Sequence, residues 1–425
     1  MTRKGSHSLY WNRRYYKTYK VQIYMTNDPL LRYRSGFPIL EKKNYLISNS
    51  LGAMPETVYN RMHEYAETWA TKGVTAWSDE WWEMAIKTGD AIAPVIGAAE
   101  GSISMHPNIT TIQEILLSCF DNEHERGERN KIVSEALNFP SVIYVTRAWT
   151  ESRGCTLELV PSGDGIHVGT QKMIDAIDEE TFLVTMSHIL FKSAYIQDAK
   201  SIIEKAHSVG AYVMLDAYQS VGIYPVDVQE LQVDFLAAGV LKWLCGGPGG
   251  CFLYVNPEVR NQLTPRFTGW FAHQRPFDFD AENMEYREDA YRFLNGTPPI
   301  PAMYAATEGV GIIQSAGIEA IRDKSLRQTD MLIDRADAYG FTINSPRQRE
   351  CRGGTVTLDV PNGYEVVREL IERNIVVDYR KGAGIRIAPH FYNTDEELIA
   401  AVDTIKDILT TGAYKKHTGH TSVVT

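Results

Sequence analysis

The chain has few cysteines, no metal-binding pattern and no long apolar run, and each absence excludes a class of protein. Its 425 residues include five cysteines, which are odd in number and scattered. There is no Cys-x-x-Cys pair and no His/Cys spacing typical of a metal site, so free thiols in a reducing cytoplasm and no metal are expected. No apolar run approaches the roughly 20 residues that cross a bilayer, so no membrane partner is expected.

Basic residues are outnumbered by acidic ones, 43 to 53. The net charge is −10, with 44% hydrophobic and 23% charged residues, which suits a soluble globular protein of two or three domains. An acidic balance argues against nucleic acid as a partner. Residues 1–24 are basic, carry no acidic residue and lack the apolar core of a secretory signal. We expect this segment to be a poorly ordered head; an organelle-targeting segment, or a start at Met25, is the alternative.

Helical stretches alternate with short β-rich runs between about residues 80 and 255. The runs are 132–135, 182–187, 212–216, 235–239 and 250–255. This alternation is typical of βαβ units in a mostly parallel sheet that is covered on both faces. We therefore predict an α/β fold with an N-terminal segment at 25–60 and a large domain at 61–300.

A second, smaller α/β domain is predicted at residues 301–412. It contains a helix around 318–338, strands near 355–360, 375–378 and 384–388, and a last helix that begins at a capping box, Thr394–Glu397. The polar residues 413–425 form a tail that we expect to fray.

Two charged residues stand at the ends of apolar, strand-like runs. Lys242 follows the run 233–241 and precedes a glycine-rich turn, and Asp216 ends the run 211–215. One strand–connection–strand step separates them, so both can reach one edge of the sheet, where α/β folds bind ligands. The alternatives are a helix-capping role for Asp216 and a surface position for Lys242.

A lysine and a carboxylate at one sheet edge are the pair that pyridoxal phosphate (PLP) requires. The lysine forms a Schiff base, and the carboxylate keeps the pyridine nitrogen protonated. Because an unpaired buried carboxylate is costly, a cationic ligand atom is a favourable partner for Asp216. A desolvated pocket lowers the pKa of a lysine, which favours the nucleophilic amine of Lys242. Gln219 is close enough in sequence to hydrogen-bond the phenolic oxygen of the same ligand.

Other residues fit the remaining parts of such a ligand. Thr110 and Thr111 open a helical stretch, where hydroxyl and backbone donors bind phosphate; an ordinary capped helix is the alternative. Arg386 lies inside a strand and matches a carboxylate, or else forms a structural salt bridge. Phe139 follows a strand, where its ring can stack on a flat cofactor or join the core.

Several stretches carry a family resemblance. Asp216–Gly222 and the Lys242 segment resemble the class V branch of the fold-type I PLP-dependent enzymes. Further stretches resemble the kynureninases in particular and occur in that family's order: Tyr45–Gly52, Gly269–His273, Arg292–Ile300, Arg352–Gly354 and Arg386–Asn393. The resemblance implies a fold-type I transferase fold with PLP as cofactor.

The resemblance also implies roles for residues at the cofactor. Lys242 would form the Schiff base and later move the Cα proton, while Asp216 would pair with the pyridine nitrogen. Phe139 would stack on the ring, and Thr110 with Thr111 would hold the phosphate.

Further implied roles concern the substrate and a partner subunit. Arg386 would bind the α-carboxylate of an amino acid substrate, with Asn49 near the same carboxylate. Trp270 and His273 would lie near the cofactor and the substrate. Thr297 would reach the phosphate of the partner subunit, because the family's site lies at a homodimer interface.

The chain departs from the kynureninase pattern at three positions, and in addition the family's histidine near the aromatic pocket is not evident in Gly73–Asp79. Leu241 replaces the tyrosine that usually precedes the Schiff-base lysine as a phosphate ligand and acid catalyst. Gln219 stands where these enzymes usually have histidine, as in desulfurase-like members of class V. Val142 stands where they usually have aspartate.

The resemblance predicts hydrolytic Cβ–Cγ cleavage of a kynurenine-like amino acid to an aromatic acid and alanine. The alternatives are β-elimination or C–S lysis, and aminotransfer or epimerisation of another amino acid. A persulfide-forming desulfurase would need a cysteine on a mobile loop, and Cys351 is the only cysteine in a plausible loop. A PLP-binding regulatory protein is the non-enzyme alternative.

Overall fold

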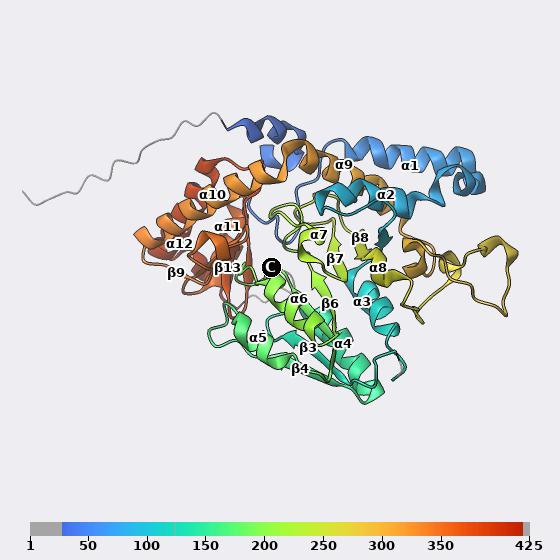
Figure 1. The fold of residues 1–425 in the computed structure, drawn as a ribbon. Coiled ribbons are helices and arrows are strands. Elements are labelled where there is room, and N and C mark those ends of the chain that lie inside the picture. The colour runs from blue at the N-terminus through green and yellow to red at the C-terminus, as the bar shows by residue number, and fades with distance from the viewer. Residues whose placement is uncertain (1–27, 124, 420–425) are drawn as a thin grey trace, which may run out of the picture.

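The computed structural model describes residues 28–123 and 125–419. The predicted head at 1–24 and the last six residues of the predicted tail lie outside the described residues. The fold is α/β, with a large sheet in one half of the molecule and a smaller sheet beneath the C-terminal helices (Figure 1).

A seven-stranded sheet in the order β2-β8-β7-β6-β5-β3-β4 forms the centre of the larger part. The strands are β2 (Ile103–His106), β3 (Lys131–Glu135), β4 (Thr156–Val160), β5 (Thr181–Ser187), β6 (Tyr212–Asp216), β7 (Phe235–Gly239) and β8 (Cys251–Val255). Only β8 runs antiparallel to its neighbours, so the predicted mostly parallel sheet is confirmed. Every residue of β5 is buried, as expected for a central strand covered on both faces.

Helices cover both faces of this sheet and continue into the C-terminal part (Figure 1). The helices are α1 (Val58–Lys72), α2 (Met84–Ile92), α3 (Ile109–Ser118), α4 (Pro140–Arg153), α5 (Thr170–Ala176), α6 (Ala199–Ser208), α7 (Val228–Leu231), α8 (Pro257–Arg260), α9 (Ile300–Ala316), α10 (Ile318–Ala338), α11 (Gly363–Glu372) and α12 (Asp395–Thr411). The capping box predicted at Thr394 is confirmed at the start of α12.

Short 3₁₀ helices and one π-helical turn, at Trp77–Trp81, fill several connections. The 3₁₀ helices are Pro29–Gly36, Pro38–Glu41, Gly73–Thr75, Ala93–Val95, Trp270–Ala272, Pro276–Asp278, Ala290–Phe293, Arg349–Cys351 and Ala413–His417.

The smaller part is built on a four-stranded antiparallel sheet in the order β12-β13-β10-β9. Its strands are β9 (Thr342–Ile343), β10 (Val356–Asp359), β12 (Asp378–Arg380) and β13 (Gly384–Ile387). The strand predicted at 375–378 is divided in two. Its first half, β11 (Ile375–Val376), pairs in parallel with β1 (Asn44–Tyr45), whereas its second half turns to pair with β13.

Two strands of the large sheet were not predicted from the sequence, nor were the two-residue strands β1 and β9. β2 has only four residues, too short for a clear periodic pattern. β4 lies at the sheet edge and is partly exposed along most of its length, so it carries little apolar signal.

The predicted fraying of the tail is corrected for residues 413–417. His417 is buried, with its Nε2 atom 3.1 Å from Oε2 of Glu369, and Lys416 Nζ lies 2.7 Å from the same oxygen. These contacts hold the 3₁₀ turn against α11.

The boundary between the two parts is better placed at Gly317 than at residue 300. Helix α9 packs against α1 and α2, whereas α10 packs against α12. We therefore propose that α9 belongs with the larger part.

The segment 44–52 joins the two parts. Its β1 strand pairs with β11, and the amide of Gly52 donates to the carbonyl of Leu241 over 2.8 Å. A Cβ atom on Gly52 would lie 2.1 Å from the carbonyl oxygen of Lys242. Only glycine therefore allows this segment to pack so closely on the Lys242 turn.

Substitution of Gly52 by alanine is expected to lower the free energy of unfolding by about 1–3 kcal/mol, the usual range for overpacking against backbone. Gly36→Ala is the matched control, because a Cβ there meets nothing within 4 Å. Denaturant unfolding of both variants checks this, and equal stability of the two would contradict the account.

Candidate active site

A pocket of about 440 Å³ opens beyond the carboxyl ends of the strands of the large sheet. It is lined by Asn49, Ser50, Asn108, Ile109, Thr110, Phe139, Ser141, Ser187, Ile189, Phe191, Asp216, Tyr218, Gln219, Leu241, Lys242, Arg380 and Arg386. Most of the residues that the sequence singled out therefore meet in one place. Thr111, Thr297, Trp270 and His273 do not line it.

Asp216 ends β6 in the middle of the sheet, opposite Ser187 of β5 and Ala237 of β7. It is buried, and its Oδ1 atom accepts a hydrogen bond from the Tyr218 amide at 2.9 Å. No basic side chain among the described residues forms a salt bridge with it. Burial raises the pKa of the Asp216 carboxyl, while the Tyr218 amide and Lys242 oppose the rise. A buried carboxylate facing a pocket fits a protonated ring nitrogen.

Lys242 follows β7 and points its amine into the same pocket. Its Nζ atom lies 4.4 Å from the centre of the Tyr218 ring and 5.6 Å from that of Phe139. Burial lowers the pKa of the amine to about 8; Asp216 raises it and Arg386 lowers it further. The amine is therefore a better nucleophile near neutral pH than an ordinary lysine.

Arg386 and Arg380 share one carboxylate at the edge of the pocket. Arg386 Nε donates to Oδ1 of Asp378 over 2.8 Å, and Arg380 Nη2 lies 2.8 Å from Oδ2. Arg386 also donates to Ser50 Oγ, at 2.8 Å, and to the carbonyl of Phe191. The salt bridge considered from sequence thus exists. Two guanidinium groups on one carboxylate still leave a positive charge at the pocket, which suits a ligand carboxylate.

Asn49 lines the pocket with a buried side-chain amide whose hydrogen-bonding groups are unused among the described residues. Its side chain is only 1% exposed, and neither Nδ2 nor Oδ1 has a partner among the described residues. Buried amides left unpaired cost free energy, so this amide fits a polar ligand group. Gln219 holds the segment in place, because its Nε2 donates to the Asn49 carbonyl at 3.0 Å and its Oε1 accepts from Trp243.

The first turn of α3 offers donors for an anion. Asn108 caps the helix, and its Oδ1 accepts from both the amide and the hydroxyl of Thr111, at 2.9 and 3.1 Å. Capping thus occupies Thr111, while Thr110 faces the pocket. Phe139 is 39% exposed at the pocket wall, where its ring can stack on a flat ligand.

Three of the predicted residues, Trp270, His273 and Thr297, lie in the stretch between β8 and α9, part of which projects from the body of the molecule (Figure 1). Trp270 Nε1 donates to the carbonyl of Pro276 at 2.5 Å, and the ring packs on Trp82. Both ring nitrogens of His273 are bonded within this segment. Thr297 is exposed. Their predicted roles at the cofactor and substrate remain predictions.

Tyr218 and Arg380 are the main site residues that the sequence analysis missed. Tyr218 comes two residues after Asp216, and this proximity was a usable signal. Arg380 enters the pocket only because β12 pairs with β13, which sets Arg380 opposite Gly384 and Asp378 opposite Arg386.

The family model for aminotransferase class-V matches residues 44–398. The chain belongs to the aminotransferase class-V family. It is 30% identical to the kynureninase of Pseudomonas fluorescens over 395 residues, which cover 90% of this chain and 93% of that one. It is also 30% identical to the kynureninase of Shouchella clausii over 425 residues, covering 96% and 98% of the two chains.

Solved structures share the fold. The cysteine desulfurase of Thermococcus onnurineus NA1 superposes with a TM-score of 0.79 at 21% identity, covering 89% of this chain and 98% of that one. The cystine C–S lyase C-DES has a TM-score of 0.77 at 20% identity, covering 87% and 99%. A C-DES mutant with glycine covalently linked to its PLP cofactor also matches, with a TM-score of 0.78.

Family and fold confirm the predicted class V, fold-type I enzyme with PLP as its cofactor. All five cysteines are free thiols. Within residues 28–123 and 125–419, no helix is both long and apolar enough to cross a membrane.

The rate at which cofactor-free protein attaches PLP is expected to rise with pH through about 8 and then level off. Attack requires the unprotonated amine, and the pKa of Lys242 lies near 8 rather than at its usual 10.5. Stopped-flow absorbance measures the rate. In Asp216→Asn the midpoint should move to lower pH, because the Asp216 charge raises the pKa of Lys242. A rate that climbs steadily to pH 10 would contradict the burial of this amine.

Proposed function

We propose that this enzyme hydrolyses the Cβ–Cγ bond of an L-kynurenine-like amino acid, releasing an aromatic acid and alanine. The observation that carries the proposal is the 30% identity to kynureninases over at least 90% of the chain. The pocket supports it, because a nucleophilic lysine, a buried carboxylate and a cationic edge meet there.

The residues present fit PLP at this pocket. Asp216 would accept a hydrogen bond from the pyridine N–H and keep that proton in place, Phe139 would cover one face of the ring, and the first turn of α3 would hold the phosphate. The unpaired amide of Asn49 is a further sign that the pocket is built for a polar ligand. When bound, PLP supplies an electrophilic carbon and an electron sink for the bond electrons released at Cα.

Lys242 would act twice. Its amine would hold the cofactor covalently, and as a free amine it would take the proton from the substrate Cα. Its lowered pKa favours both steps near neutral pH. The Tyr218 and Phe139 rings border this amine, at 4.4 and 5.6 Å from its Nζ atom.

The arginine pair would orient the substrate. Arg386 is fixed by Asp378, Ser50 and the Phe191 carbonyl, so it offers its remaining N–H in one direction. The α-carboxylate would bind there, with the Asn49 amide as a second donor. Fixing the carboxylate leaves the Cα–H bond toward Lys242 and directs the side chain to the pocket mouth.

Hydrolysis adds water across the Cβ–Cγ bond, with the hydroxyl going to Cγ and a proton to Cβ. Leu241 lines the pocket where kynureninases usually have an acidic tyrosine, so the proton must come from another group or from water.

The presence of Leu241 in place of this tyrosine favours a second candidate reaction, β-elimination from a cysteine conjugate. That reaction shares the steps at Lys242 and needs no tyrosine as an acid. Glutamine at position 219 is also the residue found in desulfurase-like members of class V. A persulfide-forming mechanism has less support, because Cys351 ends a 3₁₀ helix and none of the five cysteines lines the pocket. The free thiols support a reducing compartment such as the cytoplasm.

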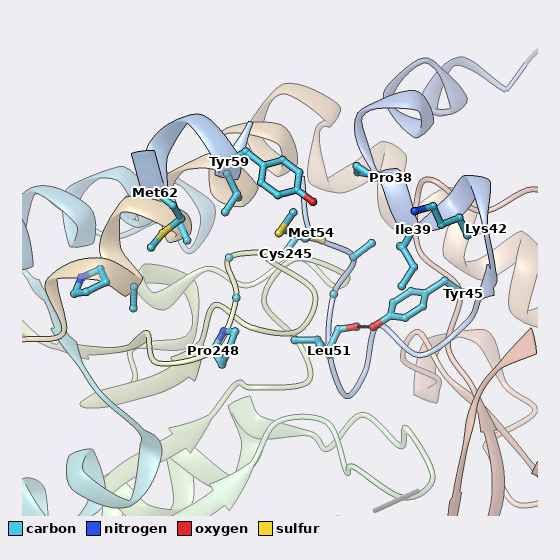
Figure 2. Close-up of a pocket in the computed structure, with 18 residues that line it drawn as sticks. Pro38, Ile39, Lys42, Tyr45, Leu51, Met54, Tyr59, Met62, Cys245 and Pro248 are labelled. Carbon is cyan, nitrogen blue, oxygen red and sulfur yellow. Dashed lines mark hydrogen bonds between the residues drawn. The ribbon is translucent and has the colours of Figure 1, made fainter. Parts of the chain in front are cut away.

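A homodimer would complete the site. A larger, mainly apolar cavity of about 630 Å³ lies between the N-terminal segment, α1 and the turn after Lys242 (Figure 2). Tyr59 and Met62 of α1 line it and are 63% and 36% exposed. This cavity carries no residue of the predicted chemistry, so we assign it to a second copy of the chain, whose exposed Thr297 would face the phosphate.

Purified protein with PLP is expected to convert L-kynurenine or 3-hydroxykynurenine to the matching anthranilate and alanine. Lys242→Ala should lose at least about 10³-fold in kcat, because it removes both the covalent link and the proton carrier. Lys87→Ala, at an exposed lysine of α2, is the control. Mass spectrometry identifies the products. Pyruvate and a thiol from a cysteine S-conjugate, without alanine from kynurenine, would move the enzyme to the second candidate.

The chain is expected to sediment as a dimer, and Tyr59→Glu to shift it toward the monomer because a charge enters the apolar contact. Tyr144→Glu is the control, since Tyr144 is equally exposed, at 69%, but lies on α4 far from α1 (Figure 1). A parent chain that sediments as a monomer overturns the proposal.

A further inference from the structure

Tyr218 is a half-buried phenol of the pocket to which neither the proposed reaction nor the sequence assigned a role. Its amide holds Asp216, and its ring lies 4.4 Å from the Lys242 amine. Burial raises the pKa of its hydroxyl above the usual range, so the group stays protonated and acts as a donor.

The Tyr218 ring fills the space that a side chain at position 239 would otherwise take. Gly239 ends β7, and a Cβ atom there would lie 2.0 Å from both Cζ and Oη of Tyr218. Any side chain at position 239 would expel the phenol. The glycine therefore admits the hydroxyl of Tyr218 to the space that a side chain of β7 would otherwise fill.

The hydroxyl lies toward the first turn of α3, the end of the pocket proposed above for the phosphate. It contacts Sγ of Cys251 at 3.5 Å, and Cys251 pairs with both Gly239 of β7 and His106 of β2. The backbone amide of Ile109, the first residue of α3, also points at this sulfur. The phenol and the first turn of α3 thus converge on one point.

Among the described residues, the Tyr218 hydroxyl has one hydrogen-bonding contact, to Sγ of Cys251, and a thiol is a weak acceptor. Position 241, which faces the same pocket, offers leucine and no hydroxyl. An anion beside Ile109 and Thr110 would give the phenol a strong, charged acceptor.

We propose that Tyr218 donates its phenolic hydrogen bond to the phosphate of the cofactor, supplying from the end of β6 the hydroxyl that Leu241 lacks. This inference rests on the proposed placement of PLP at Lys242. It makes Tyr218 a determinant of selectivity for the phosphorylated cofactor over pyridoxal, which has the same ring and aldehyde but no phosphate.

The test compares the binding of PLP and of pyridoxal to the full-length chain and to Tyr218→Phe, which keeps the ring and removes the hydroxyl. We expect the Kd for PLP to rise about tenfold or more, as for loss of a hydrogen bond to a charged group, and the Kd for pyridoxal to stay unchanged. The ³¹P resonance of bound PLP should shift in the same variant.

Two controls separate this contact from packing. Tyr144→Phe removes an exposed phenol and should change neither Kd. Cys251→Ala removes the sulfur beside the phenol and should keep the preference for PLP; loss of the preference in this variant instead would make the sulfur the ligand and overturn the inference.

The outcomes also separate this inference from the proposed function. If the parent chain gains no visible absorbance with PLP, or borohydride reduction fixes the cofactor to a residue other than Lys242, the placement of the cofactor fails. If Lys242 is labelled but Tyr218→Phe binds PLP as the parent does, with the same ³¹P resonance, the role of Tyr218 is overturned while the placement stands.

Discussion

Burial of the Asp216 carboxylate at the end of β6 is the constraint on which the site depends. The strand ends between β5 and β7, where Asp216 lies opposite Ser187 and Ala237, and the Tyr218 amide donates to its carboxylate. Such a charge is costly without a partner. A protonated nitrogen of a bound ligand would offset this cost, as we propose for PLP. The same burial lowers the pKa of Lys242.

The segment 44–52 links this sheet edge to the smaller sheet. β1 pairs with β11, Gly52 lies on the carbonyls of the Lys242 turn, and Ser50 bonds to Arg386. On the proposed placement, the cofactor would bind at the edge of the large sheet and the substrate carboxylate at the arginine pair of the small sheet. A change in the relative position of the two sheets would therefore move the arginine pair with respect to Lys242. The segment 44–52 contacts both sides.

The alternation of strands and helices is a local property, and the sequence was sufficient to predict the parallel sheet, the strand-end pair Asp216 and Lys242, and the capping box at Thr394. The sequence was less informative about residues whose position depends on how the strands pair. β2 and β4 carry weak patterns, and Arg380 reaches the pocket only through the register of β12 with β13. The position of the Tyr218 ring depends on the space left by Gly239, which no periodicity in the sequence encodes.

The sequence by itself determined the class of enzyme, because a lysine and an aspartate at buried strand ends have few uses other than PLP chemistry, and because its motifs follow the order of the class V family. Only the tertiary structure decided which donors share the pocket. Thr111 is engaged in a helix cap, and both ring nitrogens of His273 are hydrogen-bonded within its own loop. The side-chain amide of Asn49 has no partner among the described residues. The reason is physical: hydrogen bonds are satisfied by whatever lies within about 3 Å in space, and distance along the chain does not fix that.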